Sequence, residues 1–252
     1  LLRRCMPDRA DPADPSRPLY LDPAVREIPA LALGGAAREA LRMTDVLLDM
    51  LQGFRDALDK PDRRLISAIR RSDDILDRLN AAIKGYVVVL DSDALSQEDE
   101  RRVSEILTFA TNIEQAGDIV DRNLLALASK RMKRGLTFSR EGKRELLELA
   151  DTLIANTRQA ASLFMTGDAR AARMLAGEKE AFRQSEDEVT TAHFDRLRSG
   201  QVETAETSAL HLDLLRDMKQ VNSHLVAAAA YPVLARNQEL LTSRLSTAPS
   251  AN

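Results

Sequence analysis

The sequence has very little of several residue types, and each shortage excludes a class of protein. It contains a single cysteine, Cys5, in 252 residues, so an internal disulfide and a set of thiolate metal ligands are both excluded. No run of 18 apolar residues is present, so nothing in this sequence predicts a membrane-spanning helix. Tryptophan is absent and aromatic residues make up only 4%, a composition typical of long amphipathic helices and not of β-sheets.

The patterns of the common catalytic and nucleic-acid-binding classes are missing as well. A helical di-iron enzyme needs Glu-x-x-His twice, but the residues three positions before the histidines are Thr190, Ser208 and Val221. No glycine-rich phosphate loop, Gly-x-Ser-x-Gly or His-Glu-x-x-His is found. Acidic and basic residues are interleaved with a net charge of −3, which leaves no positive footprint for nucleic acid. We therefore expect neither an enzyme nor a nucleic-acid partner.

Apolar residues recur at intervals of three and four along most of the chain, which predicts amphipathic helices. Turn and capping residues divide the pattern, and Ser96 to Asp99 has the form of a capping box. Pro232 is expected to kink or end the last helix. The predicted helices span roughly 29–57, 63–90, 97–132, 139–165, 169–198, and 202 onward past Pro232.

The two halves of the chain resemble each other. Residues 38–48 are similar to 144–154, and the stretch from Arg70 to Asp74 is similar to that from Arg183 to Asp187. The fold class we predict is all-α, with two tandem pseudo-repeated three-helix bundles over 23–134 and 135–245. Six prolines by residue 29 indicate a juxtamembrane or disordered linker over 1–22, and a polar tail is expected over 246–252.

One acidic pattern occurs once in each half, 99 residues apart. Acid-x3-Asp-x4-Asn is formed by Glu114, Asp118 and Asn123, and again by Asp213, Asp217 and Asn222. A spacing of four places both carboxylates on the same side of a helix, where they repel each other. The arrangement therefore favours a bound cation or a basic partner between them.

The acids differ in their position relative to the apolar faces. Glu114 and Asp121 fall within the apolar arc of their helix and Asp118 at its edge, whereas Asp217 lies at the edge of the last helix. A buried carboxylate must be neutralised, paired with a cation or bound to a metal. Oxygen ligands suit hard cations or iron, and we list Mg, Mn, Zn or Fe as candidate ions. Asp213 and His224 lie on the same flank as Asp217. The alternative is a solvated flank with intrahelical ion pairs to Arg122, Arg216 and Lys219.

These residues resemble a known family. The stretches EQAGDIVDRN (114–123) and DLLRDMKQVNSHLVAAAAYP (213–232) are similar to the paired acidic motifs of PhoU-like domains. The nearest likeness is to the version fused to the C-terminus of bacterial sodium/phosphate cotransporter-type membrane proteins. Residues 19–43 also resemble the start of that domain, and the similarity extends over about 19–240.

The resemblance implies a six-helix fold and a regulatory, non-catalytic control of phosphate uptake. It implies metal ligands at Glu114, Asp118, Asp213 and Asp217, and Asp121, Asn123, Asn222 and His224 are additional candidates. Two positions depart from the family pattern, because Gln115 replaces the usual Arg and the second motif begins with Asp213 in place of Glu.

The fused form would also imply a place in the cell and a set of partners. Residues 1–18 would be a juxtamembrane linker, and Arg3 and Arg4 would put the domain on the cytoplasmic side of the bacterial inner membrane. The expected partners are the membrane transporter portion of the same polypeptide, a phosphate-signalling protein and a second copy in a homodimer.

Two rival functions remain open at this point. The first is a free-standing helical adaptor whose acids only solvate long helices and whose action needs no metal. The second is an oxygen-ligand metalloenzyme, which would need a general base that the sequence does not offer convincingly.

Overall fold

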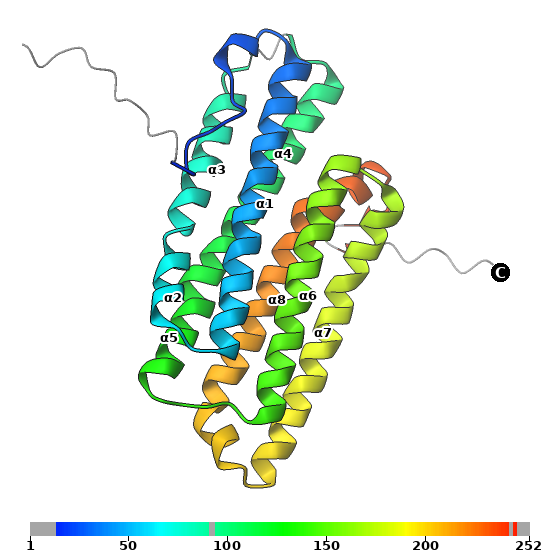
Figure 1. Cartoon of the computed structure of the whole chain (residues 1–252). Coiled ribbons are helices and arrows are strands. Elements are labelled where there is room, and N and C mark those ends of the chain that lie inside the picture. Colours follow the sequence, from blue (N-terminus) through cyan, green and yellow to red (C-terminus); the bar gives the residue numbers. More distant parts are fainter. Residues whose placement is uncertain (1–13, 91–93, 242–243, 246–252) are drawn as a thin grey trace, which may run out of the picture.

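The computed structural model describes residues 14–90, 94–241 and 244–245, and within them it confirms the all-α prediction. Long helices run side by side along one direction (Figure 1). The helices are α1 (Pro29–Asp59), α2 (Arg63–Arg70), α3 (Asp73–Val87), α4 (Gln97–Ile119), α5 (Ala126–Lys133), α6 (Arg140–Thr166), α7 (Ala169–Arg198) and α8 (Val202–Arg236). A 3₁₀ turn spans Pro23–Val25, and a π-helical segment spans Val120–Leu125.

Short polar side chains determine where the helices begin. Asp62 accepts hydrogen bonds from the backbone N–H groups of Arg64 and Leu65 at the start of α2. The capping box predicted at Ser96 and Asp99 is confirmed, with each side chain bonded to the other residue's backbone N–H. Ser139 and Asp168 cap α6 and α7, each by accepting a single backbone N–H, from Gly142 and Ala171 respectively.

Two helices that we predicted as continuous are interrupted. The predicted helix over 63–90 is divided at Arg71 and Ser72 into α2 and α3, which lie end to end in Figure 1. The predicted helix over 97–132 contains the π-helical segment between α4 and α5. A π turn adds one residue to the helical ladder, which rotates the following helix and is often found at functional sites.

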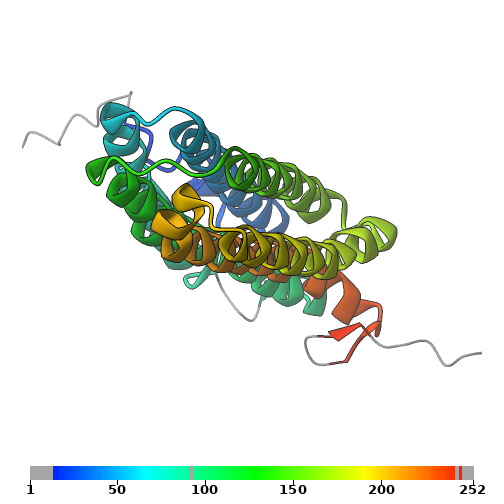
Figure 2. The same ribbon diagram turned by 90° about the horizontal axis from the view of Figure 1, so that it is seen from below.

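Pro232 does not end α8, which continues for four more residues to Arg236. The fixed φ of proline is compatible with a helix, and the flanking residues Ala230 and Val233 are buried, so packing holds the chain helical despite the lost hydrogen bond. A two-strand antiparallel ladder of β1 (Leu240–Leu241) and β2 (Arg244–Leu245) follows outside the bundle (Figure 2). The polar tail predicted over 246–252 lies outside the described residues.

Residues 14–22 belong to the fold, although we predicted a linker over 1–22. The backbone N–H groups of Leu19 and Tyr20 both donate to Oε2 of Glu39, at 2.8 Å each, and this α1 side chain is fully buried. The Tyr86 hydroxyl donates to the carbonyl of Asp22. The buried carboxylate thus fastens this segment to the bundle, while 1–13 lie outside the described residues.

The helices of the two halves share one apolar core. α1 packs on α6 and α4 on α8, and the rings of Phe109 (α4) and Phe164 (α6) stack with their centroids 3.9 Å apart. The division into two bundles at residue 135 stays a prediction, because nothing in the structure marks that boundary as independent.

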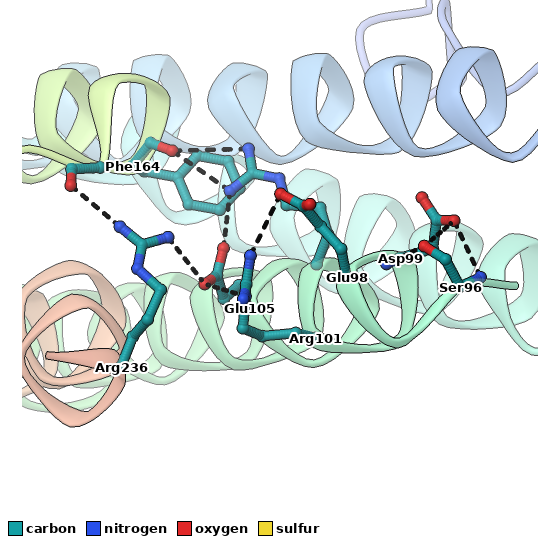
Figure 3. A network of polar contacts seen from close by, with 9 residues as sticks. Ser96, Glu98, Asp99, Arg101, Glu105, Phe164 and Arg236 are labelled. Carbon is teal, nitrogen blue, oxygen red and sulfur yellow. Dashed lines mark hydrogen bonds and ion pairs between the residues drawn. The ribbon is translucent and has the colours of Figure 1, made fainter. Parts of the chain in front are cut away.

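A polar network lies at the junction of α4, α6 and α8 (Figure 3). Arg102 donates to Glu105 and to the carbonyl of Phe164, and Arg236 donates to the carbonyl of Gly167. The network borders a cavity of about 160 Å³. Because its arginines are already bonded to carboxylates and helix-end carbonyls, we interpret it as a joint between helices and not as a ligand site.

Candidate metal centre

Three carboxylates converge where α3 packs against α4. Asp77 of α3 and Glu114 and Asp118 of α4 each offer one oxygen, and these oxygens all lie within 4.8 Å of one another. Two oxygens bound to one cation at 2.0–2.6 Å are separated by at most about 5 Å, so the spacing fits a shared divalent ion. Among the described residues, no other group of three potential metal ligands lies this close together.

The backbone of α4 can approach α3 here because residue 117 is glycine. A Cβ placed on Gly117 would lie 2.2 Å from Cδ1 of the buried Leu76 and 3.7 Å from Oδ1 of Asp73. Any side chain at this position would therefore displace Leu76 or push the two helices apart. The glycine between Glu114 and Asp118 thus brings both acids up to the acids of α3.

Asp73 lies in the first turn of α3, near this group, and one of its carboxylate oxygens is unpartnered. It is 8% exposed and its Oδ1 has no hydrogen-bond partner. Burial, together with the nearby charges of Asp118, Asp121 and Asp77, raises the pKa of Asp73 to about 6, against an opposing effect of Arg122. A bound cation would reverse this effect and stabilise the ionised carboxylates.

Two further carboxylates in this region, Glu114 and Asp121, also have raised pKa values. Burial is the main cause that raises the pKa of Glu114, and the charges of Asp118 and Asp77 add to it. Burial also raises the pKa of Asp121, an effect opposed by Arg70 and Arg122. Lys84 lowers the pKa of Glu114 in the same way, but the carboxylates still outnumber these three cations, so the cluster has capacity for additional positive charge.

The available arginines are only loosely engaged. Nη2 of Arg122 lies 2.8 Å from Oδ1 of Asp118, but that oxygen makes no hydrogen bond of acceptable geometry. Nε of Arg70 lies 3.4 Å from Oδ1 of Asp121. Arg122 is 63% exposed, so it can swing away at small cost if a cation takes its place.

The second acidic motif has a different environment. Arg216 lies 2.9 Å from Asp213 and 3.1 Å from Asp217, which is buried. No third carboxylate joins them within the described chain. The repeat alignment gives a reason, because Arg216 occupies the position of Gly117. An arginine of the same helix therefore neutralises these acids, and the sequence expectation of a ligand pair there receives no support from the geometry.

Two of the remaining predicted residues join helices through hydrogen bonds. Asn222 accepts a hydrogen bond from Asn156 and donates one to the carbonyl of Glu178, so it ties α8 to α6 and α7. His224 contacts Oδ1 of Asn112 through Nδ1 at 3.0 Å, and burial lowers the pKa of this imidazole. Asn123 is half-buried on the π-helical segment.

Asp73 and Asp77 are the site residues that our sequence reasoning missed. They repeat the acid-x3-Asp spacing of Glu114 and Asp118, and this was the available signal. Spacing alone did not reveal that the two pairs face each other, because that depends on the contact between α3 and Gly117.

Replacing Asp73 by asparagine is expected to stabilise the protein in metal-free buffer at pH 7.5 by about 3 kcal/mol, since the pKa is raised from 3.8 to about 6 and one pKa unit corresponds to about 1.4 kcal/mol. The folded state holds the proton of Asp73 more tightly than the unfolded chain does. Stability is therefore lost as pH rises from about 4 through 6, and the full cost remains above pH 6.

Urea unfolding of both proteins at pH 4 and pH 7.5 measures this difference. Comparing the variant with wild type cancels the opposite contribution of His211, whose pKa burial lowers to about 3. An equal gain at both pH values would contradict the assignment to ionised Asp73, and millimolar Mg²⁺ should shrink the gain at pH 7.5.

Comparison with known proteins gives a consistent set of likenesses. Residues 40–122, which include Asp77, Glu114 and Asp118, match the model of the PhoU domain. The chain is 40% identical over 218 residues to a Salmonella typhimurium protein named "Putative inorganic phosphate export protein YjbB", covering 86% of this chain and 40% of that protein. The protein of the same name from Escherichia coli K12 is 38% identical over 223 residues, covering 88% and 41%. The chain thus spans about two fifths of the length of these curated relatives.

Two solved structures share the fold at low sequence identity. The crystal structure of PhoU from Pseudomonas aeruginosa has a TM-score of 0.73 at 17% identity, covering 82% of this chain and 97% of that one. The phosphate transport system regulatory protein PhoU from Streptococcus pneumoniae has a TM-score of 0.74 at 14% identity, with coverages of 85% and 99%. In the described part of the chain, no helix combines the length and hydrophobicity needed to cross a bilayer.

Proposed function

Since this chain carries a PhoU domain, we propose that it is the regulatory domain of a longer phosphate-transport protein and that a divalent cation at Asp77, Glu114 and Asp118 controls its state. The names of the relatives support the link to phosphate transport. They speak of export, so we propose control of export in place of the uptake that the sequence resemblance suggested.

The transport step itself would belong to the part of such a protein that this chain does not include. The relatives are about two and a half times as long as the region they share with it, which leaves room for a membrane domain. We place the helical domain at the cytoplasmic face of that membrane domain, as the resemblance implied. Its own contribution is conformational, and we propose no chemical step within it.

The observation that carries the proposal is the convergence of three carboxylates near the buried Asp73, whose Oδ1 has no hydrogen-bond partner. Mutual repulsion in this cluster opposes the close contact of α3 and α4. A divalent cation would cancel that repulsion and tighten the contact, whereas loss of the cation would loosen it. The spacing of the two helices is therefore the property that we expect the metal to control.

The oxygen donor set is suited to Mg²⁺ or Mn²⁺. The bundle would present these carboxylates from two helices, so the bound ion would cross-link α3 and α4. An ion-paired arginine, Arg122, would be displaced from Asp118 into solvent.

Metal binding is tested by elemental analysis and by titration with Mn²⁺ of wild type and of Glu114→Gln/Asp118→Asn. We expect one ion per chain in wild type and at least a hundredfold weaker binding in the variant, because charged ligands are replaced by neutral ones of the same shape. The matched control is Asp213→Asn/Asp217→Asn, which makes a chemically similar change at the same spacing in α8 and should leave binding unchanged. Folded, metal-free wild type that takes up no ion would overturn the metal proposal.

The link to transport is tested in the longer phosphate-transport protein that we propose, with this chain as its regulatory domain. Cells expressing the Glu114→Gln/Asp118→Asn variant should export phosphate at a rate that no longer responds to divalent cation supply. An unchanged response, with normal protein levels, would contradict regulation through this site.

A further inference from the structure

A groove lies between the end of α2 and one face of α5, on the other side of the π-helical segment from the candidate metal centre. It encloses about 290 Å³ and is lined by Arg70, Ala126, Ser129, Lys130, Lys133 and Arg134. Four of these residues lie on α5 and Arg134 is its C-cap; all five follow one another at intervals of one, three or four, so they form one stripe along that helix and its end. Four of the six lining residues are cationic and none is acidic, and we call this feature the basic groove.

The cations of the basic groove have little compensation from the protein. Within the part of the chain that the structure describes, Lys130, Lys133 and Arg134 have no carboxylate oxygen within 4 Å, whereas Arg70 has only Asp121 at 3.4 Å. The dipole at the end of α5 favours basic residues in its last turn, but it does not account for Arg70, which enters from α2. Like charges at three- and four-residue spacing repel one another, so an anion in the groove would stabilise them.

The π-helical segment determines where the stripe of α5 points. One residue added to the helical ladder rotates the following helix by about 100° relative to an uninterrupted α-helix. The segment also carries Asp121, whose carboxylate and carbonyl both contact Arg70, the carbonyl at 3.5 Å. Arg70 therefore stands between the acidic cluster and the basic groove and can bond to only one of them fully.

We propose that the basic groove binds a phosphate group through Arg70, Lys130, Lys133, Arg134 and the hydroxyl of Ser129. A phosphate dianion offers several acceptor oxygens and no obligatory donor, which matches a lining of guanidinium, ammonium and hydroxyl donors. The shared chemistry is the phosphate oxyanion, whether it is free inorganic phosphate or the headgroup of an anionic lipid.

Phosphate in the groove would also change the candidate metal centre. An anion that bonds to Arg70 draws this arginine away from Asp121. The unpaired carboxylate of Asp121 then makes the electrostatic potential at Asp73 and Asp118 more negative, which favours a divalent cation there. Because such coupling is reciprocal, a bound cation tightens phosphate binding by the same factor. This coupling rests on the proposed function, but phosphate binding in the groove does not.

The test is isothermal titration of the whole chain with inorganic phosphate at low ionic strength, using Lys130→Gln/Lys133→Gln as the groove variant. We expect saturable binding that weakens at least tenfold in this variant. The matched control is Lys60→Gln/Arg158→Gln, which removes two exposed positive charges outside the groove and should weaken binding less than twofold. An equal loss in both variants would show only general charge attraction and would overturn the proposal.

Co-sedimentation with phosphatidylglycerol vesicles distinguishes the two sources of phosphate. Vesicle binding that the groove variant loses, without measurable binding of free phosphate, assigns the groove to a lipid headgroup. Free phosphate binding without vesicle binding assigns it to the soluble ion. Absence of both would refute the basic groove as a phosphate site.

Repeating the phosphate titration with Mg²⁺ separates this inference from the proposed function. Tighter phosphate binding in wild type, but not in Glu114→Gln/Asp118→Asn, supports the coupling. Groove-dependent phosphate binding in a protein that takes up no metal would leave the groove standing and contradict only the metal proposal.

Discussion

Replacing Phe109 with alanine is expected to lower the free energy of unfolding by about 3–5 kcal/mol, the usual cost of removing a buried phenyl ring. Phe109 is fully buried in α4, and its ring stacks on that of Phe164 from α6 at an interplanar angle of 16°. The contact joins the two halves of the chain, and Arg102 lies over the Phe164 ring at 4.5 Å. The variant therefore loses apolar burial and the alignment of the joint in Figure 3.

Chemical denaturation followed by circular dichroism measures this loss. Phe194→Ala is the matched control, because the same side chain is truncated where it is 43% exposed, and we expect a loss below about 1 kcal/mol. A double-mutant cycle of Phe109→Ala with Phe164→Ala should give a coupling of about 0.5–1.5 kcal/mol. Equal losses in Phe109→Ala and the control would contradict the packing described here.

Gly117→Ala is expected to destabilise the protein by about 1–3 kcal/mol through overpacking, although alanine normally favours a helix over glycine by up to about 1 kcal/mol. The added Cβ would lie 2.2 Å from Cδ1 of Leu76, which is fully buried and has little room to move. Either α3 or α4 must then shift, and Asp77 moves away from Glu114 and Asp118. Cation affinity should fall at least tenfold with the loss of stability.

Gly177→Ala provides the control, since Gly177 lies inside α7 and a Cβ there meets nothing within 4 Å. It should stabilise the protein by about 0.5–1 kcal/mol and leave cation binding unchanged. Urea midpoints and Mn²⁺ titrations of both variants decide the matter. If Gly117→Ala stabilised the protein as Gly177→Ala does, the result would contradict the close contact of α3 and α4 at this glycine.

Local sequence signals predicted most of the helices well. The starts of α1, α2, α4, α6, α7 and α8 lie within one residue of their predicted positions, because proline or a capping side chain marks nearly all of them. The break at Arg71 and the π turn at Val120–Leu125 have no such local signal. Both depend on how the apolar faces fit their neighbours, which periodicity does not encode.

The candidate site was predictable only in part. Helical spacing identified Glu114 and Asp118, but it also predicted Asp213 and Asp217 as ligands, although these lie less deeply on the apolar face of their helix. What separates the two motifs is the residue between the acids, since glycine admits a second helix and Arg216 supplies a counter-charge. The missing partner Asp77 comes from α3, and its contribution depends on tertiary packing.

The hydrogen bonds from the backbone of Leu19 and Tyr20 to Glu39 determine where a mechanical force on the N-terminal segment would act on the domain. Tension applied to the chain at residue 14 is not transmitted first to the start of α1, because Oε2 of Glu39 receives both backbone N–H groups inside that helix. Arg42 reinforces this clamp by donating to the carbonyls of Pro15 and Arg17. Segment 14–22 and α1 should therefore move as one lever, with the pull delivered about three helical turns beyond Pro29.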